Sequence, residues 1–308
     1  LYAHPELKRT IDPRAVEEYF ALGYVADPRT IFKGLFKLPP AHTLLLKVGM
    51  NSLPEPKQYW DFPFQSSSEK SENQTVEELA QRFREAVSMR MMSEVPLGAF
   101  LSGGVDSSAV VAMMSELSDE SVNTCSISFD NPKFDETSYA KKVADRYHTN
   151  HFIETVDPDD FSLIDKLANI YDEPYADSSA IPTYRVCELA KKRVTVALSG
   201  DGADEYFSGY RRHRWHMNEE KIRSFLPYAI RGPFFGFLGK VYPKLDWAPK
   251  FLRAKTTFQA IGRDSVAAYF HTMSVLSDDM RSKLFSNEFK QSLQGYNAVE
   301  VFRRHAKK

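Results

Sequence analysis

The sequence predicts an α/β fold in which a parallel sheet is covered by helices on both faces, with a short β-rich segment before it and helices after it. Three observations support this class. Strand-length apolar runs alternate with helical spacing between residues 75 and 210. The runs before residues 102 and 199 end in glycine-bearing turns, and helical spacing follows each turn. Beyond residue 210 the pattern is mostly helical and its periodicity is weaker. Such alternation is typical of βαβ units, whose ligands bind at the carboxyl ends of the strands.

The first 64 residues form the predicted β-rich segment. Asp12 and Pro13 predict a helix start, as N-cap and first helical residue, with the helix running to Phe20. Strand-like runs follow at 30–34 and 43–48. A stretch rich in Ser, Glu and Asn then predicts a linker. The expected organisation is residues 1–64 as one segment, 65–74 as the linker and 75–308 as the main domain.

The main domain is expected to begin with a helix whose capping box pairs Thr75 with Glu78, and whose apolar spacing continues to Met91. The alternation that follows predicts strands at 96–101, 124–129, 151–156 and 193–198, and helices at 104–117, 137–147, 159–171 and 178–192.

Composition sets further limits. The 308 residues are 43% hydrophobic and 26% charged, which excludes collagen-like, disordered and disulfide-scaffold classes. Two cysteines, Cys125 and Cys187, favour a reducing compartment, here the cytoplasm. No apolar run approaches the roughly 18 residues that span a bilayer, and no signal peptide opens the chain.

The net charge of −1 is unevenly distributed. Residues 1–210 carry 21 basic and 33 acidic side chains, whereas residues 211–308 carry 19 and 8. A basic region of this kind leaves a nucleic-acid partner open, although a solvated face is the interpretation we favour. A first residue other than Met and an unfinished helical pattern at 302–308 are typical of a piece of a longer protein.

The segment Leu101-Ser-Gly-Gly-Val-Asp-Ser-Ser108 carries the predicted chemistry. Its two glycines let the backbone approach an anion, and the helix that follows points free N–H groups and its positive dipole end at the same place. Ser102, Ser107 and Ser108 add hydroxyl donors, while Asp106 suits a hard cation such as Mg²⁺ bound to a phosphate. The spacing is neither a P-loop nor a Rossmann fingerprint.

A second segment, Leu198-Ser-Gly-Asp-Gly-Ala-Asp-Glu205, follows the fourth predicted strand. Adjacent strand ends are expected to bring Asp106 and Asp204 together around a metal ion. The alternative is an acidic surface turn with local Asx bonding.

Residues 102–108 resemble the pyrophosphate loop of the PP-loop ATP pyrophosphatases. Together with 198–205 and Phe207-Ser-Gly-Tyr210, they resemble the synthetase domain of the glutamine-dependent asparagine synthetase family. The segments Phe134-Asp-Glu136 and Asp172-Glu-Pro174 fit its bacterial members, and Thr30-Ile-Phe-Lys-Gly34, Leu38-Pro-Pro-Ala41 and Tyr59-Trp60 are similar to the end of its glutaminase domain.

The resemblance implies an ATP-dependent amidation. A carboxylate attacks the α-phosphorus of ATP, pyrophosphate leaves, and ammonia from glutamine displaces AMP from the acyl-adenylate. It implies ATP and Mg²⁺ as cofactors. No membrane partner is expected, because no apolar run is long enough to span a bilayer, and a homodimer remains open. The implied residues are Leu101 and Ile127 beside adenine, Ser199 and Gly200 on the nucleotide, Ser102, Gly103, Gly104, Ser107 and Ser108 on pyrophosphate, and Asp106 and Asp204 on Mg²⁺.

Three departures from the family pattern stand out. Asp201 occupies the position where asparagine synthetases usually carry the Glu linked to forming or aminating the adenylate, which leaves the acceptor open. Position 1 is Leu rather than the glutaminase Cys, and no Arg- and Pro-rich segment with the family's catalytic Lys precedes Lys308. The resemblance therefore implies a nucleotide site without the complete catalytic set. Another PP-loop adenylating enzyme and a non-catalytic nucleotide- or nucleic-acid-binding module remain alternatives.

Overall fold

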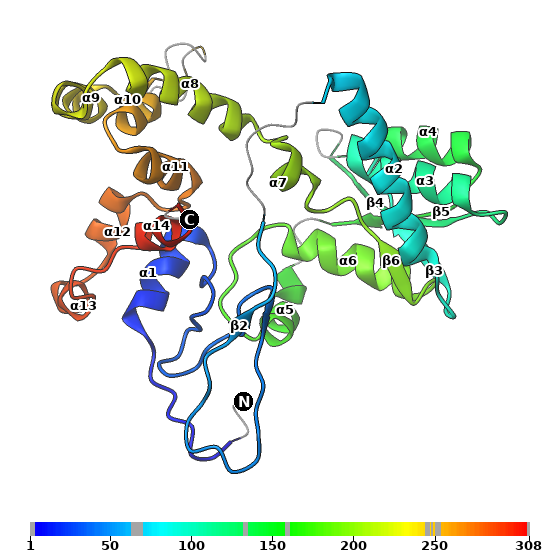
Figure 1. Ribbon diagram of the computed structural model, residues 1–308, viewed down its shortest axis with the longest axis horizontal. Helices are drawn as coiled ribbons and strands as arrows, with labels where there is room; N and C mark the ends of the chain where they lie inside the picture. The colour runs from blue at the N-terminus through cyan, green and yellow to red at the C-terminus, as the bar shows by residue number, and fades with distance from the viewer. Residues whose placement is uncertain are drawn as a thin grey trace. The chain divides into compact units, whose positions relative to one another are not determined.

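The computed structural model divides the chain into two compact units (Figure 1). It describes residues 4–62, 70–131, 135–157, 161–243, 247, 249 and 254–306. Unit 1 comprises Leu1–Pro63, Ala168–Asp177 and Tyr210–Lys308, and unit 2 comprises Phe64–Leu167 and Ser178–Gly209. Residues 65–69 of the predicted linker, Phe134, the start of the predicted 159–171 helix and the last two residues lie outside the described residues.

Unit 2 is built on a four-stranded sheet in the order β5-β4-β3-β6, with all neighbouring strands parallel. The strands are β3 (Leu97–Phe100), β4 (Asn123–Phe129), β5 (Asn150–Val156) and β6 (Val196–Leu198). The parallel sheet predicted from the alternation is confirmed. Because β6 returns to the far side of β3, the strand order reverses between β3 and β6, which is where open α/β sheets bind ligands.

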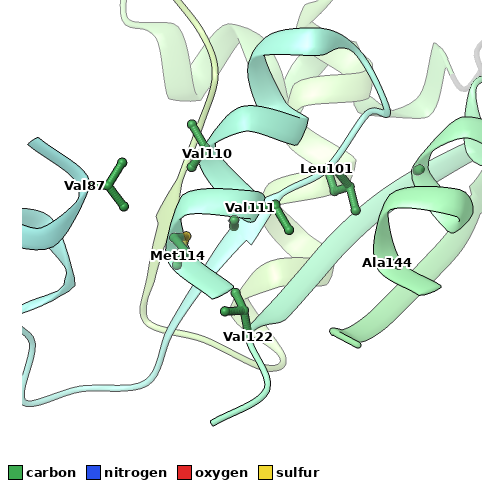
Figure 2. Packing of buried hydrophobic residues seen from close by; sticks show 9 residues of the cluster. Val87, Leu101, Val110, Val111, Met114, Val122 and Ala144 are labelled. Atoms are coloured by element: carbon green, nitrogen blue, oxygen red, sulfur yellow. The ribbon is translucent and has the colours of Figure 1, made fainter. Parts of the chain in front are cut away.

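Helices cover both faces of this sheet, as the sequence predicts. Ala99 and Leu101 pack with residues of α2 (Glu72–Met91), α3 (Val105–Leu117) and α4 (Thr137–Tyr147) in the cluster shown in Figure 2. Cys125 and Phe100 pack on the other face with Leu189 and Ala190 of α6 (Ala180–Lys191). The remaining elements of this part of the chain are η1 (Phe161–Leu163), α5 (Ile164–Tyr171) and α7 (Ala203–Phe207).

The start of α2 differs from the prediction. Its N-cap is Ser71. In the capping box each of Ser71 and Gln74 donates its backbone N–H to the side chain of the other, four residues before the pair expected at Thr75 and Glu78. Both pairs fit the capping pattern, and the earlier one adds another turn of hydrogen bonds to the helix.

Unit 1 begins with α1 (Pro13–Leu22), capped by Asp12 with Pro13 in the first turn, as predicted. The strands predicted at residues 30–34 and 43–48 are wrong: neither forms with these bounds. The described part of this region has only β1 (His42–Thr43) and β2 (Lys57–Gln58), and isolated bridges such as Ile11 to Phe32. A strand needs a partner of matching length, and these runs find only short ones.

The rest of unit 1 is helical, as expected: α8 (Arg211–Phe225), α9 (Tyr228–Val241), α10 (Lys255–Ile261), α11 (Ser265–Met273), α12 (Asp278–Leu284), α13 (Asn287–Ser292) and α14 (Val299–Ala306). Within the described ranges, the chain offers no helix with the length and apolarity that crossing a membrane requires.

Buried ion pairs join the two ends of the chain inside unit 1. Glu17 on α1 accepts a hydrogen bond from Arg281 Nε at 3.0 Å, and Arg281 is only 1% exposed. Glu18 accepts from Arg29 Nε at 3.0 Å and from the Tyr296 hydroxyl. Burial raises the pKa of Glu17, an effect that Arg281 opposes. Burial and the Glu18 carboxylate together raise the pKa of Tyr296.

Between β5 and β6 the chain leaves unit 2 at residue 168 and returns to it at residue 178. Residues 168–177 belong to unit 1. Ala176 N–H donates to the Gly23 carbonyl at 2.8 Å, and Lys37 Nζ lies 2.7 Å from Glu173 Oε1. The connection from β5 to β6 therefore contains an excursion that makes contacts with residues of unit 1.

Candidate functional site

The first glycine-bearing bend directly follows β3. Leu101 continues the sheet ladder, donating its N–H to the Cys125 carbonyl at 3.0 Å. Gly103 has φ +87°, and a Cβ there would lie 2.5 Å from Ala140 N in the first turn of α4. Gly104 is the N-cap of α3 and makes no side-chain cap bond. Only glycine meets both demands at position 103, so the close approach of backbone to backbone explains that residue.

Hydroxyl groups fix the shape of this bend. Ser102 Oγ and Ser107 Oγ lie 2.9 Å apart, and Ser107 Oγ accepts from Ser102 N–H at 3.2 Å. Gly104 N–H donates to Ser102 Oγ at 3.2 Å. Ser108 Oγ is buried and has no hydrogen-bond partner among the described residues. A buried hydroxyl without a partner is costly in the free protein, and a bound acceptor would satisfy it.

The second bend lies against the first. A Cβ on Gly200 would stand 2.6 Å from Ser107 N and 2.8 Å from the carbonyl carbon of Asp106, both backbone atoms that cannot move aside. Asp201 N–H donates to Ser199 Oγ at 3.2 Å, which closes the turn. The two bends meet at the point where the strand order reverses, as the sequence predicts.

Two carboxylates stand in the first turns of the helices that follow the two bends. Asp106 is in the first turn of α3 and Asp204 is in the first turn of α7, both half-buried. Gly209 makes room for the second one, because a Cβ at 209 would lie 1.9 Å from Asp204 Oδ1. Carboxylate oxygens are ligands that Mg²⁺ prefers, and it commonly completes its shell with water and phosphate oxygens. The described residues contain no cluster of three or more His, Cys, Asp or Glu side chains that would hold a metal ion by themselves.

A cavity of about 280 Å³ opens at the carboxyl ends of β3, β4 and β6. Five of the predicted site residues line it: Leu101, Ser102, Ile127, Ser199 and Asp201. The other predicted residues, Gly103, Gly104, Asp106, Ser107, Ser108, Gly200 and Asp204, are not part of this lining. Its further walls are Phe100, Cys125, Ser126, Phe129, Glu136, Thr137, Ala140, Pro182, Thr183 and Val186.

Sequence reasoning missed the walls that come from the starts of α4 and α6. Glu136 and Thr137 precede or open α4, and Pro182, Thr183 and Val186 lie in α6. The rule that ligands bind beyond the strand ends would have suggested Glu136 and Thr137. No motif marks the α6 residues, because they contribute ordinary helix side chains.

Electrostatics around the cavity favour protonated thiols. Burial raises the pKa of Cys125, and burial together with Asp201 raises the pKa of Cys187 on α6. A thiol with a raised pKa is a poor nucleophile at neutral pH. The chemistry of this site therefore falls to its backbone N–H groups, hydroxyls and carboxylates.

The family model described as "Asparagine synthase" matches residues 78–307. A protein named putative asparagine synthetase [glutamine-hydrolyzing] 2, from Methanocaldococcus jannaschii, is 45% identical over 227 residues, covering 73% of this chain and 43% of the relative.

Of two further relatives, one is also named an asparagine synthetase and the other is named an amidase. Asparagine synthetase [glutamine-hydrolyzing] 1 from Bacillus subtilis is 34% identical, covering 66% of this chain and 32% of that protein. Amidase chry2 from Gibberella zeae is 30% identical, covering 73% and 38%. The chain thus spans less than half the length of these curated relatives.

Proposed function

Because this chain belongs to the asparagine synthase family, we propose that it provides the ATP-dependent half of an amidation. In this reaction a carboxylate attacks the α-phosphorus of ATP, pyrophosphate leaves, and ammonia displaces AMP from the acyl-adenylate. The ammonia would be drawn from glutamine in the whole protein. The proposal covers the reaction type, and the identity of the acceptor is a separate question.

One observation carries the proposal: Gly200 is seated against the backbone of Asp106 and Ser107. This contact joins two bends that contain closely approaching backbone, hydroxyls and a helix start, beside a cavity that both bends line. A polyphosphate with a neighbouring planar base is the ligand whose chemistry matches such a pair of surfaces.

We assign the loop residues to the two ends of ATP. Ser102, Gly103, Gly104, Ser107 and Ser108 would hold the pyrophosphate through N–H and hydroxyl donors, supported by the positive end of α3. Leu101 and Ile127 would contact the adenine. Ser199 and Gly200 would contact the part of the nucleotide between the adenine and the pyrophosphate. The buried hydroxyl of Ser108, unpartnered among the described residues, supports this orientation.

Asp106 and Asp204 would hold Mg²⁺ together, which fits one carboxylate in the first turn of the helix after each bend. When bound, the ion would neutralise the charge that develops on departing pyrophosphate. Without a cation, these carboxylates would repel the phosphates that the loop donors attract.

Asp201 is proposed as the residue that acts at the acceptor end, since it lines the cavity beside Ser199. The acceptor would be aspartate or a related carboxylate. The shorter Asp side chain and the similarity to a protein named amidase support a class wider than aspartate alone.

The remaining assignments are proposals of the same kind. Residues 1–64 would be the end of a glutaminase-type domain, 65–74 a linker and 75–308 the synthetase domain. The use of ATP and two unpaired cysteines fit a cytoplasmic location.

Product analysis tests the reaction type. The whole protein that contains this chain is incubated with ATP, Mg²⁺, ammonium chloride and single carboxylates, and nucleotide and phosphate products are separated. AMP and pyrophosphate in equal amounts are expected wherever turnover occurs. ADP with orthophosphate would contradict attack at the α-phosphorus.

A binding measurement tests the site independently of turnover. Calorimetry with Mg²⁺ and ATP is expected to give saturable binding that weakens at least about tenfold, roughly 1.4 kcal/mol, in Asp106→Ala. Absence of nucleotide binding by the unaltered protein would refute the assignment.

A further inference from the structure

Strand β4, one of the two middle strands of unit 2, carries polar side chains where apolar ones are expected. Thr124 and Ser126 on β4 are 0% and 4% exposed, in a sheet covered on both faces. Buried strands of parallel sheets are usually continuous apolar runs, and a buried hydroxyl costs free energy unless it is hydrogen-bonded. These two hydroxyls therefore need partners that account for them.

Their partners form a connected path across the sheet. Thr124 Oγ1 lies 2.9 Å from both Thr149 Oγ1 and His151 Nδ1. His151 Nε2 lies 3.5 Å from Ser126 Oγ, and the Ser126 hydroxyl donates to the Leu101 carbonyl. The path runs from β5 through β4 and ends at the residue that precedes the first bend.

The end of this path is the point where strand becomes loop. Leu101 N–H donates to Cys125 and its carbonyl accepts from Ser126, so both backbone groups of Leu101 are held by β4. The next N–H, that of Ser102, donates to Ser107 Oγ. The peptide unit between Leu101 and Ser102 is therefore fixed from the strand side by Ser126 and from the helix side by Ser107.

We propose that Ser126 is a positioning residue of the phosphate-binding bend, which orients the Leu101–Ser102 peptide and with it the donors of Ser102, Gly103 and Gly104. The identity of the ligand rests on the proposed function. The effect of Ser126 on the geometry of the ligand-free loop does not depend on it. His151 and Thr124 stabilise the hydroxyl of Ser126 in the orientation that reaches Leu101.

Ser128 provides a matched control on the same face of the same strand. Its hydroxyl lies 2.8 Å from Thr155 Oγ1 on β5, and this contact does not involve the bend. Ser128→Ala removes the same group as Ser126→Ala, two residues away.

Calorimetry with pyrophosphate, ATP and adenosine, each with Mg²⁺, separates the two ends of the nucleotide. In Ser126→Ala we expect pyrophosphate and ATP to bind about tenfold more weakly, as losing one oriented hydrogen bond allows, with adenosine unchanged. Ser126→Cys keeps the size and a weaker donor, and its affinities should lie between the two. Ser128→Ala should bind all three ligands like the unaltered protein.

Three results overturn the proposal: equal losses in Ser126→Ala and Ser128→Ala, no loss in Ser126→Ala, or a parallel loss for adenosine, which would make Ser126 a contact of the base. If the unaltered protein binds neither ATP nor pyrophosphate, the proposed function fails instead.

Hydrogen exchange then decides the positioning role without any ligand. Amides of 102–104 should exchange faster in Ser126→Ala, or in Ser126→Cys if the alanine variant does not fold, than in Ser128→Ala. Equal exchange in these variants contradicts the role of Ser126.

Discussion

At Gly103 and Gly200 the site has no space for a side chain. The atoms that a Cβ would meet at these positions are mostly backbone, so a substitution must move the loop rather than a neighbouring side chain. Gly104 differs, because its φ is −67° and the nearest atom to a Cβ is the Ser102 hydroxyl, at 3.3 Å. The two neighbouring glycines of one motif thus have separate physical roles.

Alanine substitutions, which add one methyl group each, test this difference between Gly200 and Gly104. Gly200→Ala should separate the bends and weaken ATP binding by more than about tenfold, whereas Gly104→Ala should cost about threefold or less. Isothermal titration measures both, with thermal unfolding as the check on folding. Equal losses in the two variants would show that the contact at Gly200 does not organise the site.

Three partly buried histidines predict how stability depends on pH. Burial lowers the pKa of His151, His216 and His271. As the pH falls below 6.5, these three side chains therefore bind fewer protons in the folded chain than in the unfolded chain. Their contribution to stability is present above pH 6.5 and is lost as the pH falls through the lowered values. Burial raises the pKa of Glu17 and Glu219, and these groups act in the opposite direction above pH 4.5.

A single substitution isolates the histidine effect. The fall in urea midpoint between pH 7.5 and 5.5 should be smaller in His271→Gln than in the unaltered chain. His305→Gln, at an exposed position, is the control and should leave the fall unchanged. An undiminished pH dependence in His271→Gln would mean that this imidazole takes up its proton in the folded state.

Among the elements, α1 and α12 depend on a pair of opposite charges removed from water. Glu17 is 3% exposed and Arg281 is 1% exposed, with Arg281 Nη2 also 2.6 Å from Asp278 Oδ1. Removing one partner leaves the other charge buried, which costs far more than breaking an exposed pair.

Arg281→Met should therefore lower the free energy of unfolding by about 3–5 kcal/mol, measured by chemical denaturation. Arg303→Met, which breaks an exposed pair with Asp264, should cost at most about 1 kcal/mol. Adding Glu17→Leu to Arg281→Met should recover part of the loss. A single variant as stable as the unaltered chain would mean that water reaches Glu17.

The elements that the sequence predicts well are those whose signals are local. Strands β3 to β5 and helices α3, α4 and α6 lie within two residues of their predicted bounds, because apolar runs and turn residues mark both ends. β6 is shorter, starting at Val196 rather than 193. The meeting of the two bends could also be predicted, since parallel strands present their carboxyl ends at one edge.

The parts that could not be predicted depend on distant residues. The pairing of Glu17 with Arg281 joins positions 264 apart, and no local pattern announces it. The short strands β1 and β2 depend on which segments meet, not on the apolar runs themselves. The cavity wall from α6 likewise follows from helix packing against the sheet.

For the whole molecule, the proposed ATP site belongs to one of the two units. Every residue assigned to ATP belongs to unit 2. Unit 1 gathers three separate stretches of chain, including α1 and α14 from opposite ends.

This division predicts where a ligand protects the chain. At ATP concentrations about 100 times the dissociation constant, stabilisation of about 2.7 kcal/mol is expected. Hydrogen exchange should slow in residues 97–110 and 196–207 and stay unchanged in α1, α12 and α14. Equal protection of α12 and α14 would place part of the nucleotide contact in unit 1.

The excursion of residues 168–177 between β5 and β6 has a consequence for how such a protein can change over generations. Two of its partners, Gly23 and Lys37, are outside the sheet unit, and the strands on either side pair with β4 and β3 rather than with this segment. Sequence changes in this excursion would alter contacts within unit 1, whereas the pairing of β5 with β4 and of β6 with β3 involves none of its residues. A designer seeking a place to graft foreign sequence would begin at the same excursion.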